Sequence, residues 1–226
     1  MKNKTIVLNF KTYAESSGEY GLLLAKAAQK VADETGASII IAPPIPELAA
    51  VCREAKIPVF SQNADSNKAG AFTGSITLES LKAAGAKGTI INHSEKKSNP
   101  KDVKIVCERA RELGLETIVC AATVEEGAQL AAYGPTAVAV EPPELIGSGI
   151  SVSSAKPEIV SDAVKKIKAA DPRVIVLVGA GISNAHDVEK AIELGAGGVL
   201  LASAFVKAQD PHGLLKSMAQ GLEKRQ

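Results

Sequence analysis

The sequence predicts an α/β protein in which eight βα units close into a single (β/α)8 barrel. Three observations lead to this prediction: short runs that are apolar at every position, helical segments between them, and an even composition throughout. Runs without polar alternation are typical of parallel strands covered on both faces. Eight such units in 226 residues favour a closed barrel over the alternative, an open doubly wound sheet. We therefore expect one domain spanning residues 1–226.

The predicted strands are short and rich in β-branched residues, as buried parallel strands usually are. They lie at Ile6–Leu8, Ile39–Ile41, Val59–Phe60, Thr89–Ile91, Ile118–Cys120, Ala137–Val140, Val174–Val178 and Val199–Leu201. The second and third units are the least regular. Pro43-Pro44 and the long loop from Gln62 to Ser75 leave room there only for short helices.

Helices are predicted between the strands from apolar stripes and from end signals. Asn99-Pro100 and Gly114 bound one helix, because proline suits a first turn and glycine commonly follows a last turn. Thr123 and Glu126 have the spacing of a capping box that opens the next helix. The stripes consist of Val103, Val106, Ala110 and Leu113; Val160, Ala163, Val164 and Ile167, between Pro157 and Asp171-Pro172; Val188, Ala191 and Ile192, before Gly195; and Leu214, Leu215, Met218 and Leu222, after Asp210-Pro211.

The composition argues against several classes of protein. Twenty-six basic and 25 acidic residues give a formal charge of +1, so we expect neither a nucleic-acid partner nor a membrane surface. The apolar run at the N-terminus is too short for a signal peptide, and nothing approaches the roughly 18 apolar residues of a membrane span. Cys52, Cys107 and Cys120 lie in apolar settings and are expected to be reduced thiols of a cytoplasmic protein.

The sixth predicted strand ends at a single carboxylate, Glu141. Pro142 and Pro143 then restrict the backbone, and Gly147 and Gly149 follow a few residues later. A loop that begins with two rigid proline residues and ends with flexible glycine residues suits a lid that closes over a fixed catalytic base and excludes water. The alternative is an ordinary strand-to-helix loop that happens to begin with glutamate.

Polar residues also follow the first and fourth strands, at the end of a barrel where function normally lies. Asn9 and Lys11 are two residues apart and share a face of an extended segment. His93 is followed by residues that resemble the first turn of a helix, whose N–H groups would favour a neutral imidazole. Each feature alone also fits a structural or solvated role, and a surface role is expected for His186 and His212.

The seventh and eighth strands lead into small residues, at Gly179–Ser183 and Leu201–Ala204. Small side chains let backbone N–H groups approach a phosphate at the start of a helix. Glycines at such junctions often serve helix–strand packing instead, so it is the occurrence of two adjacent junctions that indicates a phosphate site.

Together these motifs resemble the triosephosphate isomerase family, in its short archaeal form. The resemblance spans essentially the whole chain and follows the family's order. Its motifs are Asn9-Phe-Lys11, Gly70-Ala-Phe-Thr-Gly74, Asn92-His-Ser-Glu95, Val140-Glu-Pro-Pro-Glu-Leu-Ile-Gly-Ser-Gly149, Gly179-Ala-Gly-Ile-Ser183 and Leu200-Leu-Ala-Ser203.

The resemblance implies a TIM barrel that interconverts dihydroxyacetone phosphate and D-glyceraldehyde 3-phosphate, in glycolysis and gluconeogenesis, without metal or cofactor. Glu141 would be the base and His93 the neutral electrophile, which is the family's known pairing. Lys11 would supply positive charge near the phosphate and the developing enediolate, Asn9 would help bind the substrate oxygen, and Glu95 would support Lys11 or the turn at His93. The residues whose backbone amides would hold the phosphate are Ile146, Gly147, Gly181, Ser183, Ala202 and Ser203.

The chain departs from the longer members of the family at three places. Ala202-Ser203 replaces the Gly-Gly pair of strand eight. Glu144 stands where their lid has tryptophan, and Gly179–Ile182 replaces Tyr-Gly-Gly-Ser. The loop that contains Thr73 resembles the one that enters a neighbouring subunit, which implies a homotetramer built as a dimer of dimers.

Three other functions deserve comparison. A Schiff-base aldolase would need a buried lysine, typically on strand six, where this chain has Glu141. A metal-dependent epimerase would need a His/Asp cluster at the strand ends, where only His93 qualifies. A non-catalytic phosphate-binding module would need the two phosphate loops but not the four polar side chains.

Overall fold

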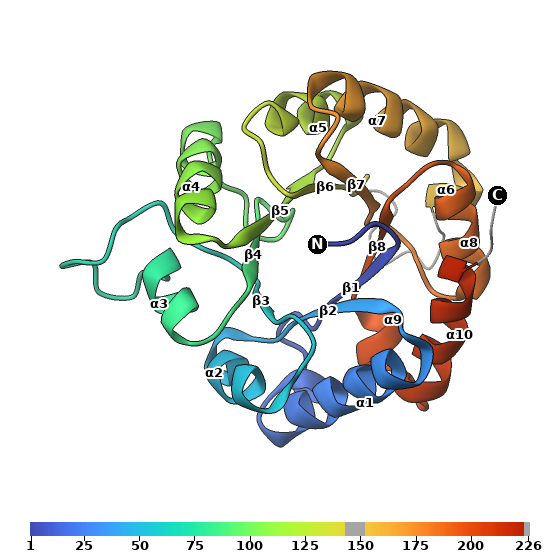
Figure 1. The fold of residues 1–226 in the computed structure, drawn as a ribbon, viewed down its shortest axis with the longest axis horizontal. Coiled ribbons are helices and arrows are strands. Elements are labelled where there is room, and N and C mark those ends of the chain that lie inside the picture. Colours follow the sequence, from blue (N-terminus) through green and yellow to red (C-terminus); the bar gives the residue numbers. More distant parts are fainter. Residues whose placement is uncertain (143–151, 224–226) are drawn as a thin grey trace.

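The computed structural model, which describes residues 1–142 and 152–223, contains one sheet of eight parallel strands in the order β2-β1-β8-β7-β6-β5-β4-β3. The outermost members of this order, β2 and β3, meet where Ile41 forms a bridge with Val59 and its N–H donates to the Pro58 carbonyl at 3.1 Å. The sheet is therefore a nearly closed ring, and the helices lie outside it (Figure 1). The predicted single-domain (β/α)8 TIM barrel is confirmed.

All eight predicted strands are present, and five of them are longer than predicted, by one to three residues. They are β1 (Thr5–Asn9), β2 (Ser38–Ala42), β3 (Phe60–Ser61), β4 (Gly88–Ile91), β5 (Glu116–Ala121), β6 (Ala137–Val140), β7 (Ile175–Val178) and β8 (Gly198–Leu201). The third strand is the shortest, in agreement with the irregular pattern of that unit.

The helices also follow the predicted stripes and end signals. They are the 3-10 turn η1 (Ala14–Ser16), α1 (Glu19–Thr35), α2 (Ile45–Glu54), α3 (Leu78–Ala83), α4 (Pro100–Leu113), α5 (Val124–Ala131), α6 (Val152–Ala155), α7 (Pro157–Ala170), α8 (Ala185–Glu193), α9 (Ser203–Val206) and α10 (Pro211–Glu223). Helix α3 is short, with 6 residues, as expected. Helix α2 was also expected to be short, but it has 10 residues.

The predicted end signals act as hydrogen-bonding caps. The side chain of Asn99 accepts the Asp102 N–H at the start of α4, and Gly114 ends that helix in the left-handed conformation, with φ of 71°. Thr123 accepts the N–H of Glu126 at the start of α5. The return bond of the capping box is shifted by one residue, because Glu126 accepts from Ala122 N–H instead.

Burial on both faces of the barrel explains why the strands are apolar at every position. Val7 and Ile40 belong to the cluster that fills the barrel, whereas Ile6, Leu8 and Ile39 pack outward beneath the helices. Successive side chains of a strand point to opposite faces, so a strand with two buried faces has no place for a regular polar alternation. Met1 packs against the interior cluster, and its ammonium group forms an ion pair with Glu116.

The same alternation indicates which residues beyond the strands point into the mouth of the barrel. Two residues after the inward-facing Ala139 comes Glu141, and two after the inward-facing Leu177 comes Gly179. Val7 in β1 is likewise followed by Asn9. The barrel thus directs residues from several strands toward one place.

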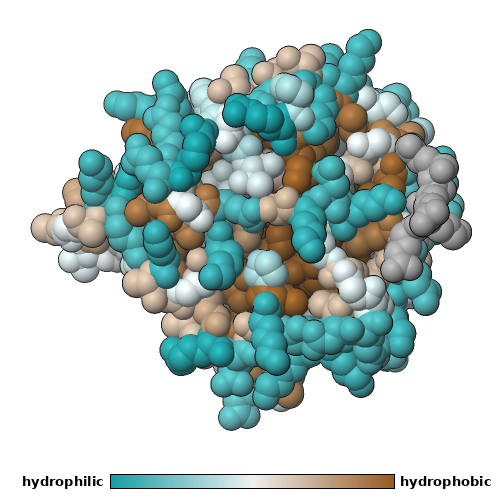
Figure 2. Space-filling model, viewed as in Figure 1, coloured by the Kyte–Doolittle hydropathy of each residue, from teal (hydrophilic) through white to brown (hydrophobic). Residues whose placement is uncertain are grey.

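The surface is largely hydrophilic over the surrounding helices, with hydrophobic residues gathered toward the centre of the face in Figure 2. No helix among the described residues has both the length and the apolar character needed to cross a bilayer.

Candidate active site

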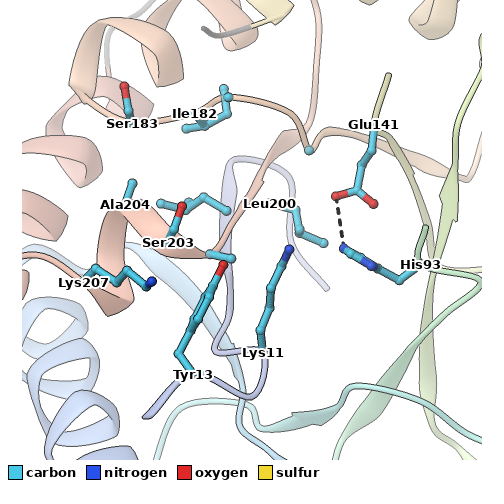
Figure 3. A pocket seen from close by; sticks show the side chains of 14 residues that line it. Lys11, Tyr13, His93, Glu141, Ile182, Ser183, Leu200, Ser203, Ala204 and Lys207 are labelled. Carbon is cyan, nitrogen blue, oxygen red and sulfur yellow. Dashed lines mark ion pairs between the residues drawn. The ribbon is translucent and has the colours of Figure 1, made fainter. Parts of the chain in front are cut away.

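A cavity of about 370 Å³ opens at the carboxyl ends of strands β1, β4, β6, β7 and β8. Figure 3 shows side chains from these separate segments converging on it. Its lining consists of Lys11, Tyr13, His93, Glu141, Gly179, Gly181, Ile182, Ser183, Leu200, Leu201, Ala202, Ser203, Ala204 and Lys207.

Glu141 is the buried acid of this cavity. Its N–H donates to the Ala121 carbonyl at 2.8 Å, which continues the β5–β6 ladder one residue beyond β6 and fixes the backbone. The residue is only 3% exposed, and its buried Oε2 has no hydrogen-bond partner among the described residues. Burial raises the pKa of this carboxyl group to about 7. A carboxylate held in this way is an effective base near neutral pH, because its pKa matches the operating range.

Gly179 provides the space in which the Glu141 carboxyl group lies. The backbone N–H of Gly179 donates to the Val140 carbonyl at 3.0 Å, so the two strand ends are in register. A Cβ atom at position 179 would lie 2.4 Å from Cγ and 2.8 Å from Oε1 of Glu141. Any other residue at position 179 would therefore displace the acid.

The direction of His93 depends on an unusual backbone conformation at Asn92. Strict alternation from the inward-facing Ile90 would turn His93 away from the barrel mouth. Asn92 adopts a left-handed φ of 60°, which interrupts the alternation. Its side chain secures this bend, donating to the Cys120 carbonyl at 2.8 Å and accepting the Ser98 N–H at 3.1 Å. The His93 ring consequently faces Glu141, with 3.7 Å between Nε2 and Oε1.

The hydrogen bonds of His93 indicate a neutral ring that carries its proton on Nε2. Nδ1 accepts the N–H of Glu95 at 3.2 Å, so the remaining ring N–H points toward the cavity. Burial lowers the pKa of His93, and the nearby positive charge of Lys11 lowers it further. The expected helical first turn after His93 is wrong in one respect. The segment forms a single turn, closed by Lys96 N–H to the His93 carbonyl at 2.8 Å, and α4 begins only at Pro100.

Lys11 is fixed at its backbone and at its side chain. Its N–H donates to Asn9 Oδ1 at 3.0 Å, and its carbonyl accepts from Gln62 Nε2 at 2.9 Å. These bonds stabilise a left-handed φ of 48° at Lys11. The ammonium group lies 2.6 Å from Glu95 Oε1, so Glu95 contacts Lys11 with its side chain and His93 with its backbone.

Asn9 is buried but is not among the residues that line the cavity. Its side-chain oxygen is used to hold Lys11. The structure thus brings Lys11, His93 and Glu141 to one cavity, with Asn9 and Glu95 supporting Lys11 from its edges.

The two expected phosphate loops lie along the other side of the cavity. Gly181, Ser183, Ala202 and Ser203 all line it. The N–H and hydroxyl of Ser183 both donate to Asp187 Oδ2, at 2.9 and 3.0 Å. At the start of α9, the first intrahelical donors are Phe205 and Val206, whose N–H groups reach the Ala202 carbonyl. The predicted lid residues Ile146 and Gly147, together with Glu144, lie outside the described residues.

Sequence reasoning did not identify Tyr13 or Lys207 as part of the cavity, whereas Ile182 and Leu200 lie in the two motifs from which the phosphate loops were predicted. Tyr13 could have been found, because it extends the same two-residue spacing as Asn9 and Lys11. Lys207 gave no such signal, since it follows a helix of four residues that the sequence pattern does not define.

The remaining titratable candidates lie elsewhere. His186 is exposed, and His212 lies 3.3 Å from Glu34 at the surface, so both expectations of a surface position are confirmed. The three cysteines are free, and burial raises the pKa of Cys107 to about 11 and that of Cys120 well above the ordinary value. Residues 1–142 and 152–223 contain no group of three or more histidine, cysteine or acidic side chains that could hold a metal ion.

The arrangement therefore combines a buried carboxylate base, a neutral imidazole donor and a fixed ammonium group around one small cavity. A base next to an aimed donor can remove a proton from a carbon atom while the neighbouring oxygen becomes negative. The small-residue loops on the opposite side suit an anionic group that does not react.

Comparison with known proteins identifies one family. The family model for triosephosphate isomerase matches residues 4–219. A curated triosephosphate isomerase from Methanothermus fervidus is 50% identical over 218 residues, which cover 96% of this chain and 98% of the relative. Triosephosphate isomerases from Methanosarcina barkeri and Pyrobaculum calidifontis are each 47% identical, covering 94% and 98% of this chain and 96% and 97% of the relatives.

The buried carboxyl group should reduce the stability of the protein at neutral pH. A carboxyl pKa near 7 in the folded state, against 4.5 as the ordinary value, means that the folded protein holds the proton more tightly between these pH values. The stabilising contribution of the protonated group is therefore complete below pH 4.5 and is lost as the pH rises through 7. We expect Glu141→Gln to increase the free energy of unfolding by about 3 kcal/mol above pH 7 and by little below pH 4.5.

Urea denaturation of both proteins across this pH range measures the effect. Glu112→Gln, which changes an exposed acid on α4, is the matched control and should give no such pH-dependent difference. A Glu141→Gln variant that is no more stable than the wild type at pH 8 would contradict the burial argument.

Proposed function

The chain belongs to the triosephosphate isomerase family and is an isomerase of that kind, and we propose that it acts through an enediolate formed at the cavity described above. The proposed reaction is the reversible interconversion of dihydroxyacetone phosphate and D-glyceraldehyde 3-phosphate. The separation of 3.7 Å between the Glu141 carboxyl group and the His93 ring is the observation that carries this proposal. We place the reaction in glycolysis and gluconeogenesis, and we propose a cytoplasmic setting, with which three free thiols are in keeping.

In the proposed first step, Glu141 takes a proton from the carbon atom next to the substrate carbonyl. The electrons of the broken C–H bond form the carbon–carbon double bond of the enediolate, and the carbonyl oxygen becomes negative. A proton then moves from the hydroxyl group on the first carbon to the former carbonyl oxygen. Glu141 returns its proton to the former carbonyl carbon, the electrons of the double bond form the new C–H bond, and the deprotonated oxygen becomes the new carbonyl. The Glu141 carboxylate is thereby regenerated. General base catalysis of this kind contributes about 10²–10⁴-fold. The raised pKa of Glu141 supports this role, since it makes the carboxylate a stronger base.

The proposed role of His93 is to donate its Nε2 proton in a hydrogen bond to the developing oxyanion. The bond from Glu95 N–H to Nδ1 and the lowered pKa both support a neutral donor ring. Lys11 would add positive charge near this oxygen and near the substrate phosphate. One preorganised donor to an oxyanion is worth roughly 3–4 kcal/mol, so these groups together would contribute more than the base alone.

The substrate phosphate would bind at the small-residue loops. Gly181, Ala202 and Ser203 are well placed for this by their position in the lining. The Ser183 N–H donates to Asp187 Oδ2 in this structure. In the proposed complex it would exchange this acceptor for a phosphate oxygen. The lid, with Ile146 and Gly147, is proposed from the sequence to complete the phosphate site and to exclude water.

A coupled assay that follows the interconversion of the two triose phosphates tests the proposal. We expect the wild-type protein to be active and Glu141→Asp to lower kcat by roughly 10²-fold with a smaller change in KM. The shorter side chain withdraws the carboxylate by about one bond length, and a displacement of this size disturbs a reaction step more than it disturbs binding. An Asp variant with near-normal turnover would rule out Glu141 as the base.

The glycine at position 179 should be required for turnover. Gly179→Ala would place a methyl group on the Glu141 side chain and displace the carboxylate. We expect kcat to fall by about 10-fold to 10²-fold while the unfolding transition changes little, because the surrounding site can accommodate a shifted side chain. Gly127→Ala is the matched control, since Gly127 lies on α5 away from the cavity and a Cβ atom there would meet only side-chain carbons, at 3.2 Å or more. Equal turnover of the two variants would contradict the proposal that Gly179 is needed to leave space for the Glu141 carboxyl group.

We propose that the protein assembles as a homotetramer, a dimer of dimers, with Thr73 at an interface. The loop between β3 and α3 projects from the ring of helices in Figure 1, and its Phe72 is 50% exposed. Arg109 fixes the base of this loop, donating to the carbonyls of Ser66 and Asn67 at 2.9 and 2.7 Å. An exposed aromatic side chain on a rigid projection suits contact with another subunit.

Sedimentation equilibrium over a range of concentrations measures the assembly directly. We expect a mass of four chains for the wild type and a smaller mass for Phe72→Asp, because a buried charge without a partner opposes association. A single-chain mass for the wild type at every concentration would overturn the proposal.

A further inference from the structure

The cavity contains a second lysine, Lys207, to which the roles proposed above assign no function. Lys207 directly follows α9 and lines the cavity together with Ser203, Ala204 and Tyr13. In Figure 3 it lies on the far side of Lys11 from His93, next to the loops proposed for the phosphate. Its position is therefore remote from the reacting carbons and close to the anionic end of a bound substrate.

Tyr13 determines where the ammonium group of Lys207 lies. The Lys207 Nζ atom is 4.4 Å from the centroid of the Tyr13 ring, a distance typical of a cation–π contact. The Tyr13 carbonyl accepts the Ser16 N–H at 3.0 Å, the Ser16 hydroxyl at 2.9 Å and the Ser17 hydroxyl at 3.1 Å. These three bonds fix the backbone of Tyr13. The Tyr13 ring is therefore attached to a fixed backbone, and its contact with Nζ restricts the positions that the Lys207 side chain can adopt.

The charges around the cavity show what Lys207 adds. The Lys11 ammonium is compensated by Glu95 at 2.6 Å, and the His93 ring is neutral. Lys207 contacts an aromatic ring, and it forms no ion pair with a carboxylate in the part of the chain that the structure describes. With Glu141 ionised, the cavity without Lys207 would have a net negative charge and would repel a dianionic substrate.

We propose that Lys207 is a specificity-determining residue that recognises the phosphate dianion of the substrate, and that Tyr13 is the residue that positions it. The inference rests on the proposed isomerase function and extends it to this side of the cavity. Lys207 supplies positive charge that no carboxylate has neutralised, and Tyr13 directs it without neutralising it. The ligand class is a phosphate monoester dianion on a small carbon skeleton.

The test compares a phosphorylated with an unphosphorylated substrate. Values of kcat/KM are measured with D-glyceraldehyde 3-phosphate and with D-glyceraldehyde, for the wild type, Lys207→Met and Lys207→Arg. Lys207→Met should lower kcat/KM for the phosphate ester by about tenfold or more and leave the value for glyceraldehyde unchanged, because only the charge-assisted contact is lost. Lys207→Arg keeps the charge and should restore most of the difference. The competitive inhibition constant of inorganic phosphate should rise by a similar factor in Lys207→Met.

Lys101→Met, which removes the charge of an exposed lysine on α4, is the matched control and should change neither substrate's kcat/KM. Equal effects of Lys207→Met on both substrates, or no effect on either, would overturn the inference while the isomerase function stands. A wild-type protein with no isomerase activity would remove the function itself. Direct binding of inorganic phosphate, measured by isothermal titration calorimetry, then still decides the inference, because a dissociation constant that is unchanged in Lys207→Met overturns it.

The positioning role of Tyr13 has its own test. Tyr13→Phe retains an aromatic face and should keep nearly all of kcat/KM for the phosphate ester, whereas Tyr13→Leu should lose several-fold. In a Lys207→Met background, Tyr13→Leu should have no additional effect, because the side chain that it positions is absent. A loss of the same size in both backgrounds would show that Tyr13 does not act through Lys207.

Discussion

Glu141 is an ionisable side chain in a position that water hardly reaches, and the rest of the site depends on this burial. A carboxylate in water is a poor base toward carbon, whereas one deprived of solvent holds its proton more tightly. Burial is possible here because β5 and β7 enclose the end of β6 and because Gly179 has no side chain. The same closeness leaves one oxygen without a hydrogen bond, a destabilising arrangement that the apolar barrel can support.

Two non-glycine residues with left-handed backbone conformations determine which polar side chains face the cavity next to Glu141. Lys11, with φ of 48°, and Asn92, with φ of 60°, occupy a region that costs most side chains about 1 kcal/mol or more. Each is held there by side-chain hydrogen bonds, from Asn9 and Gln62 in one case and from the Asn92 amide itself in the other. The bends break the alternation of β1 and β4, so polar side chains can face the cavity directly above an apolar interior.

The two ends of the cavity differ in their exposure to solvent. At one end, His93 and Glu141 are buried. Burial lowers the pKa of His93, which keeps its ring neutral, and raises the pKa of Glu141, which makes its carboxylate a stronger base. At the other end, Lys207 is exposed and its ammonium group lies over the Tyr13 ring, where we propose that the phosphate binds. A small barrel can hold both because each strand contributes its own loop, and neighbouring loops need not share a dielectric environment.

Much of this could be predicted from the sequence, because it depends on local periodicity and on turn chemistry. Uninterrupted apolar runs specified eight strands with two buried faces, Asn99, Thr123 and Gly114 marked helix ends, and Glu141, His93 and Lys11 were identified at strand ends. The relatives also agree with the archaeal resemblance of these motifs. Only the tertiary structure decided that Asn9 supports Lys11, that Gly179 accommodates Glu141, and that Lys207 reaches the same cavity over Tyr13. These relations join residues far apart in the chain, and their outcome depends on distances of an ångström or less, which no periodic pattern specifies.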